Sequence, residues 1–242
     1  GGRGDRDTAR AVQDAITAIL TRQTAEGAFG LWGPGAGDFW LDAYATDFLS
    51  RARAAGFAVP DQPFQAAIGN LVNQVNYATD PAYADPGENA ALAYASVVLA
   101  RERAARIGDL RYDADAAAES FATPMAAAQI GEALATLGDQ PRADRMFAQA
   151  RDLLAQSTDD QRVFRRDYGS LLRDRAAVLA AATQAGSTVI DTGAETRALA
   201  SQIAARTAEG AGLSTQESVW TVLAAQALGQ GGPLLTVDGL AL

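Results

Sequence analysis

The chain contains at residues 89–100 the stretch NAALAYASVVLA, which has no polar face when it is wound as a helix. A helix that is apolar nearly all round is buried on most of its sides. Residues 124–137 and 218–228 have the same character. These segments predict several helices that lie inside the fold and are covered by others.

Amphipathic segments can provide that cover. Residues 140–156 place one apolar stripe at helical spacing, formed by Ala143, Met146, Phe147, Ala150 and Leu154. Similar amphipathic segments are 5–22, 62–77 and 192–206. The apolar segments that follow these four amphipathic ones are 39–50, 89–100, 168–183 and 214–228.

This alternation predicts an all-α fold, an α/α toroid in which inner helices are ringed by outer ones. Roughly ten helical segments form about five hairpins at a repeat of about 40–50 residues, one hairpin fewer than a ring of about six requires. An open superhelix of helical repeats has the same alternation without closure and is the alternative architecture.

Several helix ends are marked by side chains that satisfy free backbone groups. Thr123 and Pro124 are typical of an N-cap followed by the first helical residue. Ser214 and Glu217 have the spacing of a capping box. Gly138 is expected to end the preceding helix in the left-handed conformation.

The last residues differ from the rest of the chain. Residues 233–240 read PLLTVDGL, a β-like run with a turn at Asp238-Gly239. We therefore expect a toroid domain over residues 1–230 and the start of a following β domain over residues 231–242.

Composition excludes several classes of function. The 242 residues carry a net charge of −9, which argues against binding to a nucleic-acid backbone. The chain has no Cys and no His, and all 20 basic residues are Arg. Disulfides, thiolate and imidazole metal sites, a Ser-His-Asp triad and a lysine Schiff base are thereby excluded, and we expect no cofactor. There is neither a signal-peptide apolar region nor a run of about 18 apolar residues that could span a membrane.

Three features could carry chemistry, and each is better explained by structure. The glycine-rich loop at residues 30–37 matches no phosphate-binding fingerprint and is expected to be a turn between helices. The carboxylates of Asp113, Asp115 and Glu119 are expected at a solvated helix start. Residues 159–166 are expected to form an exposed linker of mixed charge.

Aromatic residues gather near the first apolar helix. The densest group is Phe29, Trp32, Phe39, Trp40, Tyr44 and Phe48. Trp40, Tyr44 and Phe48 share one helix face at four-residue spacing, which favours a stripe packed on the core before a binding surface.

Motifs along nearly the whole chain resemble one family. They are GAFGLW at 27–32, WLDAYATDFL at 40–49, RAAGFAVP at 53–60, GENAALAY at 87–94 and STQESVW at 214–220. In this order and spacing they are similar to the thioester domain of bacterial alpha-2-macroglobulins. The resemblance implies a toroid of helical hairpins within a large periplasmic protease trap, commonly a lipoprotein of the inner membrane. In such a trap, cleavage of a bait region exposes a thioester formed by a Cys-x-Glu-Gln motif.

The chain departs from that family in one respect. It has no Cys, so the Cys-x-Glu-Gln motif is absent and any thioester must lie outside this chain. Either the motif lies on a hairpin upstream of residue 1, which we expect, or the parent protein has lost it. Residues 77–89, which match the region where some complement relatives carry an acyl-accepting His, also contain none. The resemblance therefore implies direct reaction of the parent protein with amines.

The resemblance also implies the partners and the role of the domain. The parent protein would bind target proteases, this domain would pack on neighbouring β domains, and membrane contact would come only from a lipid anchor elsewhere. The domain would not be an enzyme. The candidate interface and structural residues, which would shape the end of the toroid and keep the thioester dry, are Phe29, Trp32, Trp40, Tyr44, Gln216, Glu217 and Trp220.

Two other classes of function stay open from the residues alone. An α/α-toroid enzyme of the glycoside hydrolase or terpene cyclase type needs carboxylates that converge at the mouth of the ring. The candidates for that role are Asp38, Asp42, Asp47, Glu88 and Glu217. A helical-repeat scaffold that binds a partner protein is the other alternative.

Overall fold

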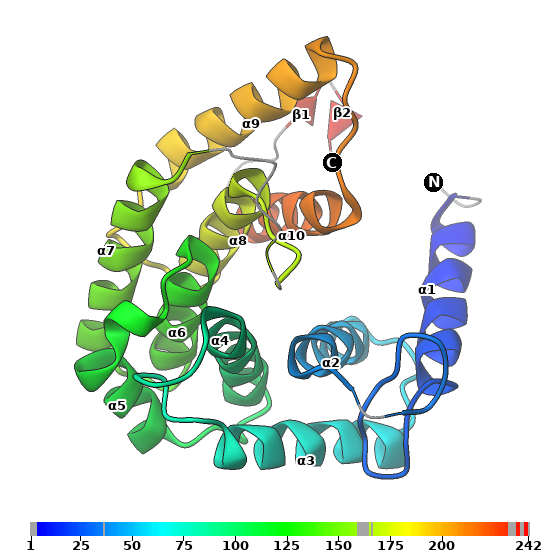
Figure 1. Ribbon diagram of the computed structural model, residues 1–242. Helices are drawn as coiled ribbons and strands as arrows, with labels where there is room; N and C mark the ends of the chain where they lie inside the picture. Colours follow the sequence, from blue (N-terminus) through cyan, green and yellow to red (C-terminus); the bar gives the residue numbers. More distant parts are fainter. Residues whose placement is uncertain are drawn as a thin grey trace.

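The structure is a computed structural model that describes residues 4–35, 37–158, 165, 167–231, 236–237 and 240–241. Ten α-helices lie within these residues and follow one another as hairpins (Figure 1). The first helices of the successive hairpins are α1 (Gly4–Leu20), α3 (Asp61–Tyr77), α5 (Ile107–Ala116), α7 (Gln140–Gln156) and α9 (Thr192–Ala208). The second helices are α2 (Phe39–Ala54), α4 (Pro86–Arg101), α6 (Pro124–Thr136), α8 (Leu171–Gln184) and α10 (Thr215–Gly231).

The helices form two layers around a curved arc. Figure 1 shows α3, α5, α7 and α9 along the outside and α2, α4, α6, α8 and α10 on the inside. Each inner helix packs on the next, from α2 to α4, α6, α8 and α10. The predicted α/α toroid with about five hairpins is confirmed.

Inner helices are buried because almost all of their residues are small or apolar. In α4 every residue from Asn89 to Ala100 is buried, and in α6 so is every residue from Pro124 to Leu134. The outer helix α7 buries one stripe only. Its buried residues are Ala143, Met146, Phe147, Ala150 and Leu154, as its periodicity predicts.

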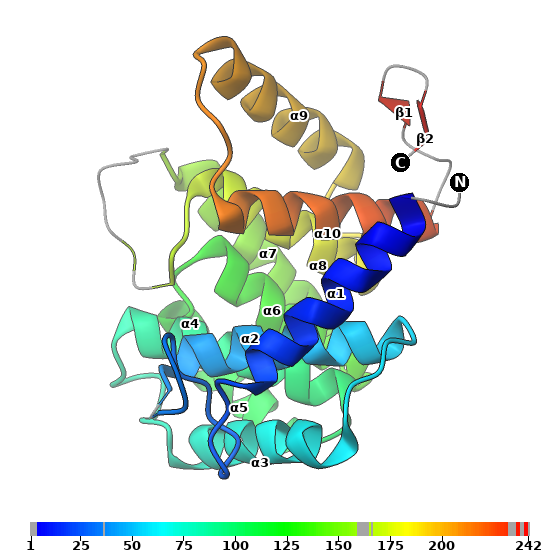
Figure 2. The same cartoon turned by 90° about the vertical axis from the view of Figure 1, so that its right-hand side faces the viewer.

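The inner helices run in the same direction. Residues from the carboxyl ends of four of them, Arg51, Arg101, Gln184 and Ala227, line a single cavity of about 260 Å³. Figure 2 shows the parallel course of α2 and α10, with α1 crossing them obliquely. The amino ends of the inner helices therefore lie together at the opposite end of the arc, which we call the N-terminal rim.

Helix ends follow the predicted capping. The Thr123 hydroxyl accepts a hydrogen bond from the Ala126 amide, with Pro124 as the first helical residue. Gly138 follows α6 with a φ of 85°, a conformation that a side chain would strain. The Glu217 amide donates to the Ser214 hydroxyl at 3.2 Å, while the Ser214 amide donates to the Glu217 carboxylate at 2.8 Å. This exchange is the predicted capping box.

Two boundaries differ from expectation. Helix α8 begins at Leu171 instead of residue 168, because the Ser170 hydroxyl caps it by accepting from the Arg173 amide. Helix α5 spans Ile107–Ala116, so Asp113 and Asp115 lie near its end and Glu119 lies in a separate 3₁₀ turn, η1 (Ala118–Ser120). The prediction that these carboxylates mark a helix start was wrong.

Two short strands lie near the end of the chain. Strand β1 (Thr236–Val237) pairs antiparallel with β2 (Leu240–Ala241), Thr236 opposite Ala241. The predicted turn at Asp238-Gly239 falls outside the described residues, and the assignment of residues 231–242 to a following β domain stays a prediction. Across the described part of the chain, no helix is both long and apolar enough to cross a membrane.

Candidate functional site

Five aromatic rings meet at the N-terminal rim. Trp40 stacks on Tyr44 with ring centroids 5.2 Å apart, and both rings meet Tyr94 of α4 edge-on, at 5.8 and 6.3 Å. Trp220 of α10 lies 5.9 Å from Tyr94, and Tyr168 lies 5.2 Å from Trp40. We call these five residues the aromatic cluster. It connects α2, α4 and α10 across the inside of the arc.

Three of the five residues of the aromatic cluster are buried, and one is largely exposed to solvent. Trp40, Tyr94 and Trp220 are buried, Tyr44 is half-buried, and Tyr168 is 52% exposed. Burial raises the pKa of Tyr44. The contact between Trp220 and Tyr94 brings α10 back to α4 across the inside of the arc, and Figure 1 shows the arc open between α1 and α10.

Tyr168 is held over Trp40 by a buried network of charges. Its φ of 54° is left-handed, which costs free energy for a residue other than glycine. Arg173, fully buried, donates to the Asp167 carboxylate and to its main-chain carbonyl at 2.7 and 3.0 Å. Arg165 donates to the same carboxylate at 2.6 Å, so it belongs to a packed cluster and the prediction of an exposed linker was wrong for this residue. The other residues of 159–166 lie outside the described part of the chain.

The predicted residues Phe29 and Trp32 do not join the cluster. Phe29 is buried in the core, and its amide donates to the Asp42 carboxylate at 2.7 Å. Trp32 is 96% exposed, on the loop between α1 and α2. That loop is a connection between helices, as predicted, and a close approach of its backbone to α3 requires glycine. A Cβ on Gly27, whose φ is 97°, would lie 2.0 Å from the Ala66 carbonyl oxygen.

Glu217 ties three helices together beside the cluster. Its carboxylate accepts from the Ser170 hydroxyl before α8 and from Arg206 of α9, both at 2.6 Å. Burial alone would raise the pKa of Glu217, but hydrogen bonds from Ser170 and Ser214 and the charge of Arg206 hold it below its ordinary value. Glu217 is thus a structural anion, ionised at neutral pH.

Asp47 is the charged centre of the inner layer. Its carboxylate is paired with Arg51 at 2.9 Å and Arg101 at 2.5 Å, and it accepts from the Tyr94 hydroxyl at 3.0 Å. Burial alone would raise the pKa of Asp47, but the two guanidinium groups hold it below its ordinary value. These bonds fasten the cluster to the middle of α2 and α4.

The other carboxylates that an enzyme would need are also engaged. Asp42 accepts from Asn70 at 3.0 Å and Gln74 at 2.5 Å, and burial raises its pKa. Asp38 caps α2, and Glu88 accepts from the Thr79 amide. No two of these groups are left free to face one substrate.

A shallow acidic cavity adjoins the cluster. It has a volume of about 200 Å³ and lies between the first turns of α2 and α4. Asp38, Trp40, Asp85 and Glu88 contribute to its walls. The described residues contain no group of three or more His, Cys, Asp or Glu side chains that could hold a metal ion. Three of its lining residues are acidic and two, Phe39 and Trp40, are aromatic.

The carboxylates of residues 113–119 do not form a site together. Asp115 is paired with Arg142 at 2.6 Å and with Arg145, both on α7, and this holds its pKa below the ordinary value. Glu119 is exposed. Asp113 is buried and points into a different recess.

Sequence reasoning missed Tyr94 and Tyr168. Tyr94 stands out as the single aromatic residue of the apolar stretch 89–100, which was an available signal. The position of Tyr168 depends on a left-handed backbone and on the Arg173 network, which no local pattern indicates. The interface role predicted for Phe29, Trp32, Trp40, Tyr44, Gln216, Glu217 and Trp220 stays a prediction.

The two layers of helices define the chain as an α/α toroid, with the aromatic cluster at its N-terminal rim. No protein-family model matches it. It is 36% identical over 190 residues to the alpha-2-macroglobulin of Escherichia coli (strain K12). The aligned region covers 74% of this chain and 11% of that protein. It is 30% identical over 234 residues to the alpha-2-macroglobulin of Xylella fastidiosa, covering 94% of this chain and 14% of that one.

Solved structures agree with this similarity. Native E. coli alpha-2-macroglobulin matches 92% of the chain with a TM-score of 0.76 and 30% identity, over 14% of its own length. Salmonella alpha-2-macroglobulin reacted with methylamine matches 94% with a TM-score of 0.77 and 32% identity, over 15%. Trypsin-activated E. coli alpha-2-macroglobulin matches 91% with a TM-score of 0.74 and 30% identity, over 15%. The chain belongs to the bacterial alpha-2-macroglobulin family, and it spans about a seventh or less of the length of the relatives it matches.

Proposed function

We propose that the chain is the thioester-type domain of a longer, periplasmic alpha-2-macroglobulin-like protease inhibitor. The observation that carries the proposal is the match in fold and sequence over more than nine-tenths of the chain to alpha-2-macroglobulins of E. coli and Salmonella. In this proposal the domain scaffolds a thioester whose Cys-x-Glu-Gln segment lies elsewhere in the parent protein, because this chain has no Cys.

Similarity to more than one state of the relatives supports a rigid scaffold. The TM-scores are 0.76 against the native form, 0.74 against the trypsin-activated form and 0.77 against the methylamine-reacted form. A domain that refolded on activation would match one of these states much better than the others. The links of α2, α4 and α10 through the aromatic cluster and Asp47 supply the stiffness that such a module needs.

The N-terminal rim suits protection of a reactive ester. A thioester survives only where water is excluded, and the packed rings of Trp40, Tyr94 and Trp220 keep the interior of that end of the domain dry and rigid. Trp32 and Tyr168 are exposed on the segments that precede α2 and α8, which supports the proposal that neighbouring β domains of the parent cover this region. The periplasmic location and a lipid anchor elsewhere in the parent are parts of the same proposal.

A non-enzymatic role is favoured over a toroid enzyme. The five carboxylates that could have converged at the mouth of the ring are each bound to backbone amides, arginines or amides of side chains. Hydrolysis of a glycoside needs two carboxyls that face one bond.

Trapping is tested with the full-length protein and trypsin. After incubation, we expect trypsin to lose activity on a large protein substrate while it keeps activity on a small peptide ester, because the trap blocks access without touching the active site. A denaturing gel should then show a covalent adduct that migrates above both proteins. Full activity on both substrates, with no adduct, would overturn the proposal.

A further inference from the structure

The loop between α1 and α2 exposes two neighbouring apolar side chains, Leu31 and Trp32, which we call the loop tip (Figure 1). Trp32 is 96% exposed and Leu31 is 57% exposed. Single apolar residues on a surface are ordinary, but an adjacent pair with a nearly fully exposed indole requires an explanation. Tryptophan is among the residues that contribute most of the binding energy at protein interfaces. The loop tip therefore has the composition of an interface.

The base of this loop is held in place by hydrogen bonds. Gln23 and Phe29 pair as an antiparallel bridge, and the Gly30 amide donates to the Arg22 carbonyl at 3.2 Å. The Gln23 side chain donates to the Pro63 carbonyl at 2.8 Å, which ties the loop to the first turn of α3. A loop that is ordered before binding loses little conformational entropy when it binds.

Asp42 and three glycines fix the chain on both sides of the loop tip. The buried Asp42 carboxylate accepts from the Phe29 amide at 2.7 Å. A Cβ on Gly37 would lie 2.4 Å from the same carboxylate. A Cβ on Gly30 would lie 2.0 Å from the Gly33 carbonyl oxygen. The glycines allow this close packing, so the loop tip projects from a rigid platform.

The loop offers no charge to a partner. Residues 27–37, GAFGLWGPGAG, contain no charged residue, and the two residues that flank them, Glu26 and Asp38, are acidic. Charged residues are depleted at the centres of protein interfaces, where aromatic residues are enriched. A lipid surface fits poorly, because proteins that bind one place Lys or Arg beside their apolar residues. The matching surface is therefore apolar, uncharged and part of a protein.

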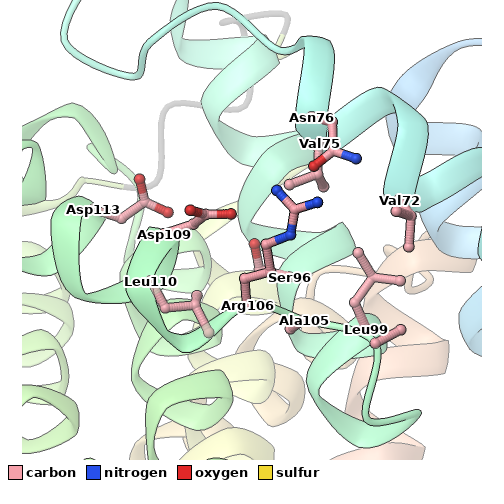
Figure 3. A pocket seen from close by; sticks show the side chains of 11 residues that line it. Val72, Val75, Asn76, Ser96, Leu99, Ala105, Arg106, Asp109, Leu110 and Asp113 are labelled. Carbon is pink, nitrogen blue, oxygen red and sulfur yellow. The ribbon is translucent and has the colours of Figure 1, made fainter.

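A second copy of this chain also fits the loop tip poorly. The recess between α3, α4 and α5 holds about 30 Å³, roughly the volume of one water molecule and too small for an indole (Figure 3). The cavity of about 200 Å³ between α2 and α4 is lined by three acidic residues. The cavity of about 260 Å³ at the carboxyl ends of the inner helices is lined by two arginines. None of these three cavities is an apolar socket that could hold an indole.

The small size of the loop tip favours a partner in the same protein. Two side chains bury far less than the roughly 1,200 Å² of a stable complex between separate proteins. Domains linked in one chain meet at a high effective concentration, so a small contact suffices to hold them together. This chain spans about a seventh or less of its relatives, which leaves most of such a protein outside these 242 residues.

We propose that Leu31 and Trp32 form an anchor that inserts into an apolar, uncharged socket on a neighbouring domain of the same parent protein. The inference rests on the proposed function, because the socket belongs to the longer chain. It deepens that proposal by naming the two residues that make the contact and the chemistry of the surface that receives them.

Hydroxyl-radical footprinting with mass spectrometry tests the proposal in the full-length protein and in the 242-residue chain. Trp32 should be oxidised about tenfold more slowly in the full-length protein, because its exposed fraction falls from 96% to that of a buried anchor. Tyr77, which is 89% exposed at the end of α3, should react equally fast in both, and the buried Trp40 should react slowly in both. Equal rates for Trp32, or equal protection of Tyr77, would overturn the proposal.

Variants test the chemistry of the socket. In the full-length protein, Leu31 should stay protected in Trp32→Phe, which keeps an apolar ring, and become oxidised in Trp32→Arg, which brings a charge. Both variants should leave the unfolding of the 242-residue chain unchanged, because Trp32 is exposed there. Protection of Leu31 in Trp32→Arg equal to that in Trp32→Phe would overturn the apolar socket.

A photo-cross-link identifies the partner. With p-benzoylphenylalanine in place of Trp32, irradiation of the full-length protein should join this position to a peptide of the same molecule from outside the 242 residues. A cross-link to a second molecule, or one that forms only with added trypsin or lipid vesicles, would overturn the proposal. These readouts are independent of trapping. A protein that traps trypsin but exposes Trp32 contradicts this inference alone, and one that protects Trp32 but does not trap contradicts the proposed function alone.

Discussion

Replacing Trp40 by alanine tests the packing of the aromatic cluster. Trp40 is 5% exposed and contacts three other rings, those of Tyr44, Tyr94 and Tyr168. The substitution removes the ring that joins the start of α2 to α4 and to the segment before α8. Trp32, which is 96% exposed and lies eight positions earlier in the chain, is the matched control.

The expected loss follows from the buried surface. A buried tryptophan covers roughly 200 Å². At about 25 cal/mol per Å² this contributes about 5 kcal/mol, an upper value because the unfolded chain already covers part of its apolar surface. Tryptophan-to-alanine changes in cores cost about 3–5 kcal/mol. We therefore expect Trp40→Ala to lower the free energy of unfolding by about 4 kcal/mol, and Trp32→Ala to change it by about 0.5 kcal/mol or less.

The assay is urea unfolding followed by circular dichroism at a helical wavelength. With a urea slope of about 2–3 kcal/mol per M, a loss of about 4 kcal/mol lowers the midpoint by about 1.3–2 M. Near-ultraviolet spectra should follow the same transition in wild type. A midpoint shift as large in Trp32→Ala as in Trp40→Ala, or no shift in Trp40→Ala, would refute the packing argument and make Trp40 a residue of an interface.

Three other substitutions test separate parts of the fold. Asp47→Ala should cost about 3–5 kcal/mol in urea unfolding, because it leaves two arginines without their buried partner, whereas Asp115→Ala, whose ion pairs are exposed, should cost about 1 kcal/mol or less. For Asp113 the pKa is raised to about 7 in the folded chain, so the folded state binds this proton more tightly than the unfolded state. Its contribution to stability is therefore present below about pH 4 and is lost as the pH rises through 7, by about 2–4 kcal/mol, and Asp113→Asn should remove this loss in unfolding curves taken from pH 4 to 8. Gly27→Ala should lower the melting temperature much more than Gly56→Ala, since both have positive φ but only a Cβ on Gly27 meets backbone atoms. Equal effects of the two glycine substitutions would show that the loop is free to move away from α3.

Much of the fold can be predicted from the sequence where burial leaves a periodic pattern. The stripe of α7 and the continuous burial of α4 follow directly from the spacing of their apolar residues. Helix α5 is short and carries the acidic residues Asp109, Asp113 and Asp115, so its pattern was obscured. Its start depends on contacts with neighbouring helices, which local sequence does not contain.

The candidate site is less predictable, because its members come from distant parts of the chain. Trp40, Tyr44 and Trp220 were identified as candidates, but nothing in their spacing indicates that Tyr94 lies between them. The anchor of Tyr168 is a fully buried arginine, Arg173, in a stretch whose charges suggest exposure. Arginine is buried there because two carboxylates surround it, a pairing that exists only in the folded chain.

The most direct test of the central claim is the intact mass of the full-length protein before and after treatment with methylamine. If the chain scaffolds a thioester that lies elsewhere in the parent, each molecule should gain one methylamine and release one thiol that a thiol reagent then labels. Both changes should be absent after prior exposure to trypsin, because activation consumes the ester. No mass change and no new thiol in the untreated protein would contradict the account and leave a domain of this family without its reactive bond.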